Sequence, residues 1–324
     1  MSAARTTGKT LLWALASLVL AAGIAAGIGI AATWAPDQPL SALRARWAPP
    51  PSAFIEVAGL QVHYRDEGPR DDPVPIVLLH GTSASLHTWE GWVAALRGTR
   101  RVVSFDLPGF GLTGPSASGD YSDAAYVRFV LQMLDTLKLP RVVLGGNSLG
   151  GGIAWETAAA APQRVAQLIL VDAAGYAFVP KSVPLGFRIA RLPLLNPLTS
   201  RVLPRRAVEA SVRNVYGHPE RVTAELVDRY TAMTLRAGNR RALAQRMVQL
   251  DRGENAARIA TLRVPTLILW GGQDRLIPPE NAARFAHDIA GSTLLLFDDL
   301  GHVPQEEDPQ RTVVAVQRFL ANRR

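Results

Sequence analysis

The chain has 324 residues and no cysteine, which excludes a disulfide scaffold and any cysteine-ligated zinc or iron–sulfur centre. Hydrophobic residues make up 48% and charged residues 19% of it, a composition that excludes an intrinsically disordered chain and allows a large α/β domain with a sizeable core. The 35 Lys and Arg residues exceed the 27 Asp and Glu residues, for a formal net charge of +8.

The first predicted element is an apolar helix at residues 11–32, in which Ser17 is the one polar residue. A helix of this length spans the ~30 Å hydrocarbon core of a bilayer. The basic flank at residues 1–10 carries Arg5 and Lys9, as in a signal sequence. Because cleavable signals have shorter apolar cores, of roughly 7–15 residues, we expect an uncleaved anchor with its N-terminus inside and the remaining chain periplasmic or extracellular. A cleaved, secreted form is the alternative.

Residues 33–52 contain five prolines without sustained periodicity and are predicted as a Pro-rich linker. Beyond it, short apolar strands alternate with amphipathic helices, which predicts an α/β fold with a mostly parallel sheet covered on both faces. The strands are expected at 54–57, 61–65, 75–79, 101–105, 142–145, 165–171, 265–270 and 292–297, and the helices at 89–96, 121–139, 149–161, 280–290 and 310–321. A helical, arginine-rich stretch at 175–262 separates the sixth strand from the seventh.

A glycine-rich turn, Gly146-Asn147-Ser148-Leu149-Gly150, joins a predicted strand to a predicted helix. At such a corner the serine side chain stands clear of the sheet, and glycines leave room on either side of it. The following helix offers its N-terminus to a developing anion. The plainer interpretation is a tight turn with an incidental serine, but the strand–turn–helix context favours Ser148 as a nucleophile.

A serine nucleophile needs a base, and the base needs a group that orients it. Of six histidines, His302 lies in a short loop after a late strand, where an imidazole reaches the carboxyl edge of the sheet. His287 lies within a helix and is expected to be structural, and His218 lies in the helical insert and is expected to be exposed. Asp274 follows the strand at 265–270 and is the predicted orienting group. The plainer interpretations are a surface-loop histidine for His302 and an Asx-turn residue for Asp274.

Stabilising an oxyanion requires two pre-placed N–H donors. The backbone N–H of Leu149 is the first. The second is expected from the loop after 75–79, with Thr82 chosen ahead of Ser83. His80 is expected to brace this loop.

The chain resembles the α/β-hydrolase superfamily from about residue 54 to its end. The matching segments are His80-Gly81, Asp106-Leu107-Pro108-Gly109-Phe110-Gly111, Gly146-Asn147-Ser148-Leu149-Gly150-Gly151, Gly271-Gly272-Gln273-Asp274 and Gly301-His302-Val303-Pro304. The resemblance implies an eight-stranded sheet with a helical cap inserted after the sixth strand. The core is then 53–174 and 263–324, and the cap is 175–262.

Ser148 argues against members of the superfamily that use an aspartate nucleophile, such as haloalkane dehalogenases and epoxide hydrolases. We expect a serine carboxylesterase or lipase-like enzyme acting on small-molecule, hydrophobic or lipid-like esters, with no cofactor and no metal. A C–C hydrolase of ring-cleavage products is the alternative. Such enzymes usually have a glycine-rich loop where this chain has Thr82-Ser83-Ala84-Ser85, and a tryptophan where it has Val303. A third alternative is a non-catalytic, anchored binding module.

The predicted cap carries 15 Lys and Arg residues against 6 Asp and Glu residues. Basic charge placed in this way can face anionic lipid headgroups, and it can equally form a solvated surface. Binding to nucleic acid is not expected, because no recognition motif accompanies the charge.

Overall fold

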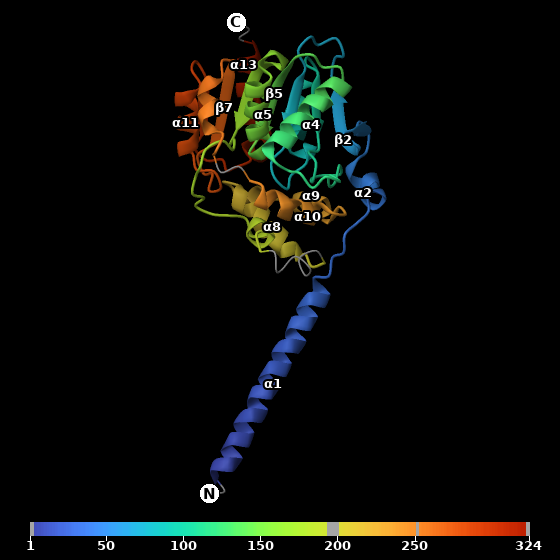
Figure 1. The fold of residues 1–324 in the computed structure, drawn as a ribbon, viewed down its shortest axis with the longest axis vertical. Coiled ribbons are helices and arrows are strands. Elements are labelled where there is room, and N and C mark those ends of the chain that lie inside the picture. The colour runs from blue at the N-terminus through green and yellow to red at the C-terminus, as the bar shows by residue number, and fades with distance from the viewer. Residues whose placement is uncertain (1–2, 193–200, 251–252, 322–324) are drawn as a thin grey trace.

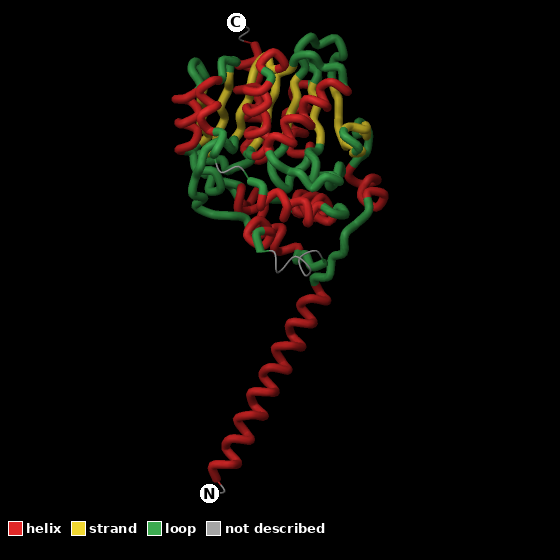
Figure 2. Tube along the Cα trace, in the orientation of Figure 1, coloured by secondary structure: helices red, strands yellow, loops and turns green. Residues whose placement is uncertain are grey.

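The computed structural model describes residues 3–192, 201–250 and 253–321. Figures 1 and 2 show three parts: a long N-terminal helix, an α/β core, and a helical cap on the side of the core from which that helix extends. The long helix, α1 (Ala3–Ala32), contains a stretch at Trp13–Ala32 with a mean hydropathy of 2.2, none of it buried. It is the one helix among the described residues that is long and apolar enough to cross a membrane, a test that signal sequences also pass.

The core is built on an eight-stranded sheet with the order β1-β2-β4-β3-β5-β6-β7-β8. The hairpin of β1 and β2 pairs antiparallel with β4, and the other neighbours are parallel. This confirms the predicted mostly parallel sheet. The strands are β1 (Ala53–Val57), β2 (Leu60–Glu67), β3 (Ile76–Leu79), β4 (Val102–Phe105), β5 (Val142–Asn147), β6 (Val165–Val171), β7 (Thr266–Gly271) and β8 (Thr293–Phe297).

Helices cover both faces of the sheet (Figure 1), so its central strands are mainly apolar. All four residues of β3 are buried; Val77 and Leu79 pack into the hydrophobic core on one face, and Ile76 and Leu78 into the core on the other. The first core is covered by α4 (Asp123–Thr136), α5 (Leu149–Ala160) and α11 (Glu280–Asp288), and the second by α3 (Glu90–Leu96) and α13 (Pro309–Ala321). Short helical segments complete the core: η1 (Leu86–Trp89), η2 (Pro162–Arg164), η5 (Ala256–Thr261) and α12 (Pro304–Glu307).

The cap is inserted between β6 and β7, as the resemblance implied. Its described elements are α6 (Leu185–Ala190), α8 (Arg205–Val215), η4 (Pro219–Arg221), α9 (Ala224–Leu235) and α10 (Asn239–Val248). Residues 193–200 and 251–252 of the predicted cap lie outside the described residues.

Residues 33–52, predicted as a Pro-rich linker, contain an element that the sequence analysis did not predict. A helix, α2 (Leu40–Trp47), forms within them, and Leu43 and Trp47 are buried against the domain. Leu40, Leu43 and Trp47 are spaced so that they share one face of a helix. Pro39 precedes the first helical residue. The prolines obscured this short amphipathic pattern.

The segment before α2 is hydrogen-bonded to the cap. Ala35 N–H donates to the Arg201 carbonyl at 2.8 Å, and Leu203 N–H donates to the Thr33 carbonyl at 3.0 Å. Asp37 pairs with Arg240 at 2.5 Å. We call residues 33–38 the clasp, because they join the end of α1 directly to the cap.

Candidate active site

Ser148 lies at the sharp corner between β5 and α5. Its backbone has φ 54° and ψ −116°, a strained conformation for a residue with a side chain. Gly146 and Gly150 make the corner sterically feasible: a Cβ on Gly146 would collide with the Gly150 backbone, and one on Gly150 with the Leu79 carbonyl. The N–H of Ser148 donates to the Val171 carbonyl at 2.9 Å, which fixes the corner to β6.

His302 and Asp274, which are 28 residues apart in sequence, form a buried pair. Their Nδ1 and Oδ2 atoms are 2.6 Å apart. The other carboxylate oxygen of Asp274 accepts the N–H groups of Leu276 at 2.8 Å and Ile277 at 3.0 Å. With Nδ1–H donating to the carboxylate, the Nε2 of His302 is the atom left to exchange a proton, as in a general base.

The loop that carries His302 is held from several sides by residues that the sequence analysis missed. Asn147 Nδ2 donates to the His302 carbonyl at 2.9 Å, and the His302 N–H donates to the Val215 carbonyl at the end of α8. Glu307 accepts the Gly301 N–H at 2.8 Å. Only Asn147 carried a signal, since it stands beside the predicted nucleophile.

Asp172, also missed, is fully buried next to this pair. Its Oδ1 accepts the Gly271 N–H at 3.0 Å, while its Oδ2 meets no donor among the described residues. Burial raises the pKa of the Asp172 carboxyl well above its usual range, and the nearby charge of Asp274 adds to this. Burial therefore favours the neutral form of the Asp172 carboxyl, and a proton on its Oδ2 would allow it to donate to Asp274.

Asp172, Asp274 and His302 also have ligand atoms within 4.8 Å of one another, a grouping that could geometrically hold a cation. The hydrogen bonds of Asp274 favour a role other than cation binding, because its carboxylate already accepts two backbone N–H groups and the imidazole N–H. The three residues are best described as a hydrogen-bonded acid–base cluster.

The loop after β3 lies directly against Ser148. A Cβ on Gly81 would come 3.1 Å from the Cβ of Ser148, so glycine allows the loop to approach. Neither the Thr82 N–H nor the Leu149 N–H has an acceptor among the described residues, which leaves both available to an oxyanion. His80 braces the loop: its Nε2 accepts the Leu107 N–H at 3.0 Å, and its Nδ1–H donates to the Gly81 carbonyl at 2.7 Å.

A cavity of about 190 Å³ brings Ser148, His302 and Thr82 together under the cap. Its described walls are mainly apolar and come largely from α6, α8, α10 and the residues just before α8, including Phe187, Ile189, Leu203, Val208, Val212 and Leu243. Apart from His302, Arg240 is the one basic residue in these described walls, and it is paired with Asp37 of the clasp. The cavity thus suits an apolar group more than an anion.

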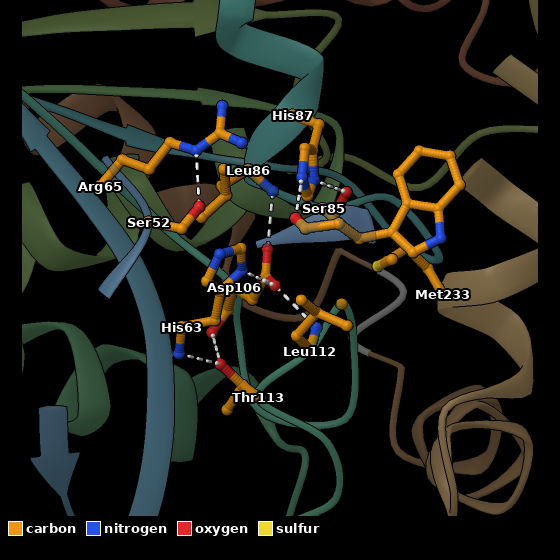
Figure 3. A network of polar contacts seen from close by, with 12 residues as sticks. Ser52, His63, Arg65, Ser85, Leu86, His87, Asp106, Leu112, Thr113 and Met233 are labelled. Atoms are coloured by element: carbon orange, nitrogen blue, oxygen red, sulfur yellow. Dashed lines mark hydrogen bonds and ion pairs between the residues drawn. The ribbon is translucent and has the colours of Figure 1, made fainter. Parts of the chain in front are cut away.

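Figure 3 shows a second histidine–aspartate pair, neither residue of which is in the described walls of this cavity. His63 Nδ1 is 2.8 Å from Asp106 Oδ2, and Asp106 also accepts the N–H groups of Leu86 and Leu112, each at 2.7 Å. His87 lies alongside; its Nε2–H donates to the Trp47 carbonyl at 2.8 Å and so secures α2. Burial lowers the pKa of His87 to about 4, although the negative charge of Asp106 acts to raise it.

The two remaining histidines lie elsewhere. His287 is on α11 with 87% of its side chain exposed, so it is not the structural residue that its position suggested. His218 is partly exposed in the cap and is 3.0 Å from Glu220. Neither belongs to the cavity walls described above.

Comparison with known proteins agrees with this architecture. A family model described as the alpha/beta hydrolase fold matches residues 74–309. An uncharacterised protein of Mycobacterium tuberculosis is 33% identical over 84% of this chain and 82% of its own length. The 2-hydroxymuconate semialdehyde hydrolase of a Pseudomonas strain is 29% identical over 82% of this chain and 93% of its own.

A solved structure described as a membrane phospholipase A, a bacterial virulence factor, is 25% identical, with a TM-score of 0.71. The match covers 97% of this chain and 98% of the other, so it extends beyond the catalytic core to the N-terminal region. Together with the sheet, the nucleophile corner and the inserted cap, these similarities show that the chain belongs to the α/β-hydrolase family. It is a hydrolytic enzyme.

Proposed function

We propose that this enzyme is a membrane-anchored serine hydrolase that cleaves carboxylic esters with apolar, lipid-like acyl groups. Ser148 is the nucleophile, His302 the general base and acid, and Asp274 the residue that orients His302. The N–H groups of Thr82 and Leu149 form the oxyanion hole.

In this mechanism His302 Nε2 takes the proton of Ser148 as Oγ attacks the ester carbonyl, and the two N–H groups bind the resulting oxyanion. His302 then gives the proton to the departing alcohol oxygen, leaving an acyl-enzyme. Water then goes through the same steps: it loses a proton to His302 and attacks the acyl carbon. Ser148 leaves as a hydroxyl after His302 returns the proton to its Oγ. Asp274 stabilises the imidazolium that forms in each step.

The observation that carries the proposal is the apolar cavity over Ser148. Apolar side chains of α6 and α8 line it, which suits a hydrocarbon acyl chain. Val202 and Leu203 also line it, and both lie where the clasp meets the cap. The acyl site is thus next to the point where α1 ends, which supports a substrate from the membrane. The similarity to a membrane phospholipase A along nearly the whole chain supports the same substrate class.

A C–C hydrolase of ring-cleavage products is the second candidate, favoured by the similarity to 2-hydroxymuconate semialdehyde hydrolase. A muconate semialdehyde carries a carboxylate, and a buried carboxylate requires a cation or several donors. Arg240 is the basic side chain available in the described walls, and its pairing with Asp37 reduces its capacity to bind a second anion. This argument favours the ester.

The test is a hydrolysis screen of the full chain in detergent micelles. It uses p-nitrophenyl esters of increasing acyl length, a diacyl phospholipid, and 2-hydroxymuconate semialdehyde, with Ser148→Ala as the blank. We expect kcat/KM to rise from the two-carbon ester to medium-chain esters, with no turnover of the semialdehyde. Turnover of the semialdehyde alone would replace the ester proposal with the C–C one.

A further inference from the structure

The cap helices α6 and α8 each have two different faces. Toward the inside, α6 lines the cavity with Phe187 and Ile189, and α8 with Val208 and Val212. Toward the outside, these elements and the segments next to them carry four exposed arginines: Arg188, Arg191, Arg201 and Arg206. We call these four residues the arginine patch.

The arginine patch forms no ion pair with a carboxylate in the part of the chain that the structure describes. None of the four arginines has an ion-pair partner among the residues that the structure describes, whereas neighbouring Arg205 pairs with Asp228 and Arg213 with Glu209. Two large apolar side chains are exposed with the patch: Trp34 is 52% exposed and Leu192 is 50% exposed. Cationic side chains interspersed with exposed tryptophan and leucine are typical of surfaces that lie in the headgroup region of a membrane.

The clasp determines which way this surface faces. Trp34, two residues after the end of α1, forms a β-bridge with Val202 of the cap. Thr33 Oγ1 donates to the Gly29 carbonyl, in the last turn of α1, at 2.6 Å. In Figure 1, α8 lies on the side of the globular part from which α1 extends, and the C-terminus lies on the opposite side. If α1 spans a bilayer, the outer face of α6 and α8 is held next to that bilayer.

We propose that the outer face of α6 and α8 binds the anionic phospholipid headgroups of the bilayer that α1 spans. The arginine patch supplies the electrostatic contacts, and Trp34 and Leu192 insert at the interface. This rests on the membrane anchor of the proposed function and not on its ester chemistry. Binding of this kind holds the apolar cavity at the membrane surface. Each arginine near an anionic surface contributes roughly a fivefold factor to the docking equilibrium.

The experiment uses the full chain reconstituted in vesicles with a headgroup-attached spin-label quencher. Because the chain has no native cysteine, a fluorophore can be attached at one introduced site. Ala210→Cys, one helical turn after Arg206 on α8, reports on the proposed surface, and Val314→Cys, 41% exposed on α13, is the distant control. We expect quenching at least about twofold stronger at the first site in vesicles containing phosphatidylglycerol, and weaker in pure phosphatidylcholine or in 1 M salt, where the Debye length is ~3 Å.

A charge-matched pair of variants separates the patch from net charge. Arg188→Gln, Arg201→Gln and Arg206→Gln together should lower quenching at the Ala210→Cys site severalfold. The control triple, Arg141→Gln, Arg263→Gln and Arg318→Gln, removes the same amount of charge from the surface of the α/β core. It should leave quenching at the Ala210→Cys site unchanged. Equal losses in both triples, or equal quenching at both label sites, would overturn the proposal.

Failure of this proposal can be distinguished from failure of the proposed function. Quenching should be the same in a Ser148→Ala background, since it does not depend on turnover. Flotation of the unlabelled chain with vesicles in high salt reports the α1 anchor separately. A chain that floats and hydrolyses esters, without quenching at the Ala210→Cys site, would contradict only the docking surface.

Discussion

Two buried histidine–aspartate pairs of nearly the same geometry occur in this molecule, and they occupy different environments. His302 and Asp274 are 2.6 Å apart beside the cavity that contains Ser148, while His63 and Asp106 are 2.8 Å apart with both side chains fully buried. The Nε2 of His63 has no partner among the described residues, and His63 is absent from the described cavity walls. A His–Asp contact alone therefore does not identify a catalytic base. What distinguishes His302 from His63 is that His302 lines the cavity that contains Ser148.

The pair at Asp106 organises structure instead. Burial alone would raise the pKa of the Asp106 carboxyl, but the charge and hydrogen bond of His63, with His80 and His87 nearby, hold it well below its usual range. The carboxylate joins β2, the loop after β3 and the turn after β4 through His63, Leu86 and Leu112. We interpret the Asp106–Gly111 motif as a brace for the loops around the active site.

The largest contrast is expected from replacing each histidine by glutamine. His302→Gln should lower kcat by about a millionfold, as loss of the base does in comparable triads, and lose roughly 1–3 kcal/mol of stability, because Asp274 also loses a buried donor. His63→Gln should retain kcat within about tenfold and lose roughly 1–3 kcal/mol of stability, because Asp106 loses a buried donor. Steady-state kinetics and thermal unfolding of both variants test this. Comparable kcat losses in two folded variants would remove the distinction between the pairs.

Replacing the aspartate of each pair by asparagine should distinguish the two His–Asp pairs in the same way. Asp274→Asn should lower kcat by roughly ten-thousandfold through the wrong imidazole tautomer, with little change in fold. Asp106→Asn should instead destabilise the protein by about 3–5 kcal/mol, because it removes one partner of a buried charged network. Circular dichroism in urea and the kinetics of both variants distinguish the outcomes. A stable, inactive Asp106→Asn variant would contradict the bracing role.

The pH dependence of stability should report on the bracing network. The pKa of His87 is lowered to about 4 from 6.5, so the unfolded chain binds more protons between these pH values and stability falls as the pH drops through that window. The full effect at pH 4 is roughly 3 kcal/mol. His87→Gln should flatten this part of the stability profile, measured by urea unfolding from pH 7 to pH 4. A profile identical to that of the wild type would show that His87 does not cause the acid sensitivity.

The smallest effect is expected at Asp172. Burial favours the neutral form of this carboxyl, one oxygen of which accepts the Gly271 N–H while the other faces Asp274, so we expect Asp172→Asn to reproduce both contacts. Its kcat should stay within about threefold of the wild type, whereas Asp172→Leu, which removes both contacts, should cost roughly 1–3 kcal/mol of stability. A loss in Asp172→Asn as large as that in Asp274→Asn would mean that Asp172 is ionised.

Much of this arrangement could be predicted because it depends on local sequence. Glycines around Ser148 predict the strand–helix corner, and the loops that follow apolar strands carry Asp274 and His302. The same reasoning could have found Asp172, which directly follows β6. The sequence order of Ser148, Asp274 and His302 also agreed with the family resemblance.

The unpredicted features depend on contacts between distant segments. Asn147 reaches the His302 carbonyl across 155 residues of sequence. The clasp pairs Trp34 with Val202, and His87 holds α2 through the Trp47 carbonyl. Local patterns do not specify such pairings. The prolines at 33–52 predicted a Pro-rich linker, within which burial of Leu43 and Trp47 stabilises a helix.

The central claim is that the His302–Asp274 pair, and not the His63–Asp106 pair, activates Ser148. The most direct measurement is the rate at which a fluorophosphonate probe labels the full chain, with the modified residue mapped by mass spectrometry. We predict a single adduct on Ser148, formed at least about a hundredfold more slowly in Asp274→Asn and at a nearly unchanged rate in folded His63→Gln. Labelling of another serine, or a rate that falls with His63→Gln and not with Asp274→Asn, would contradict the account.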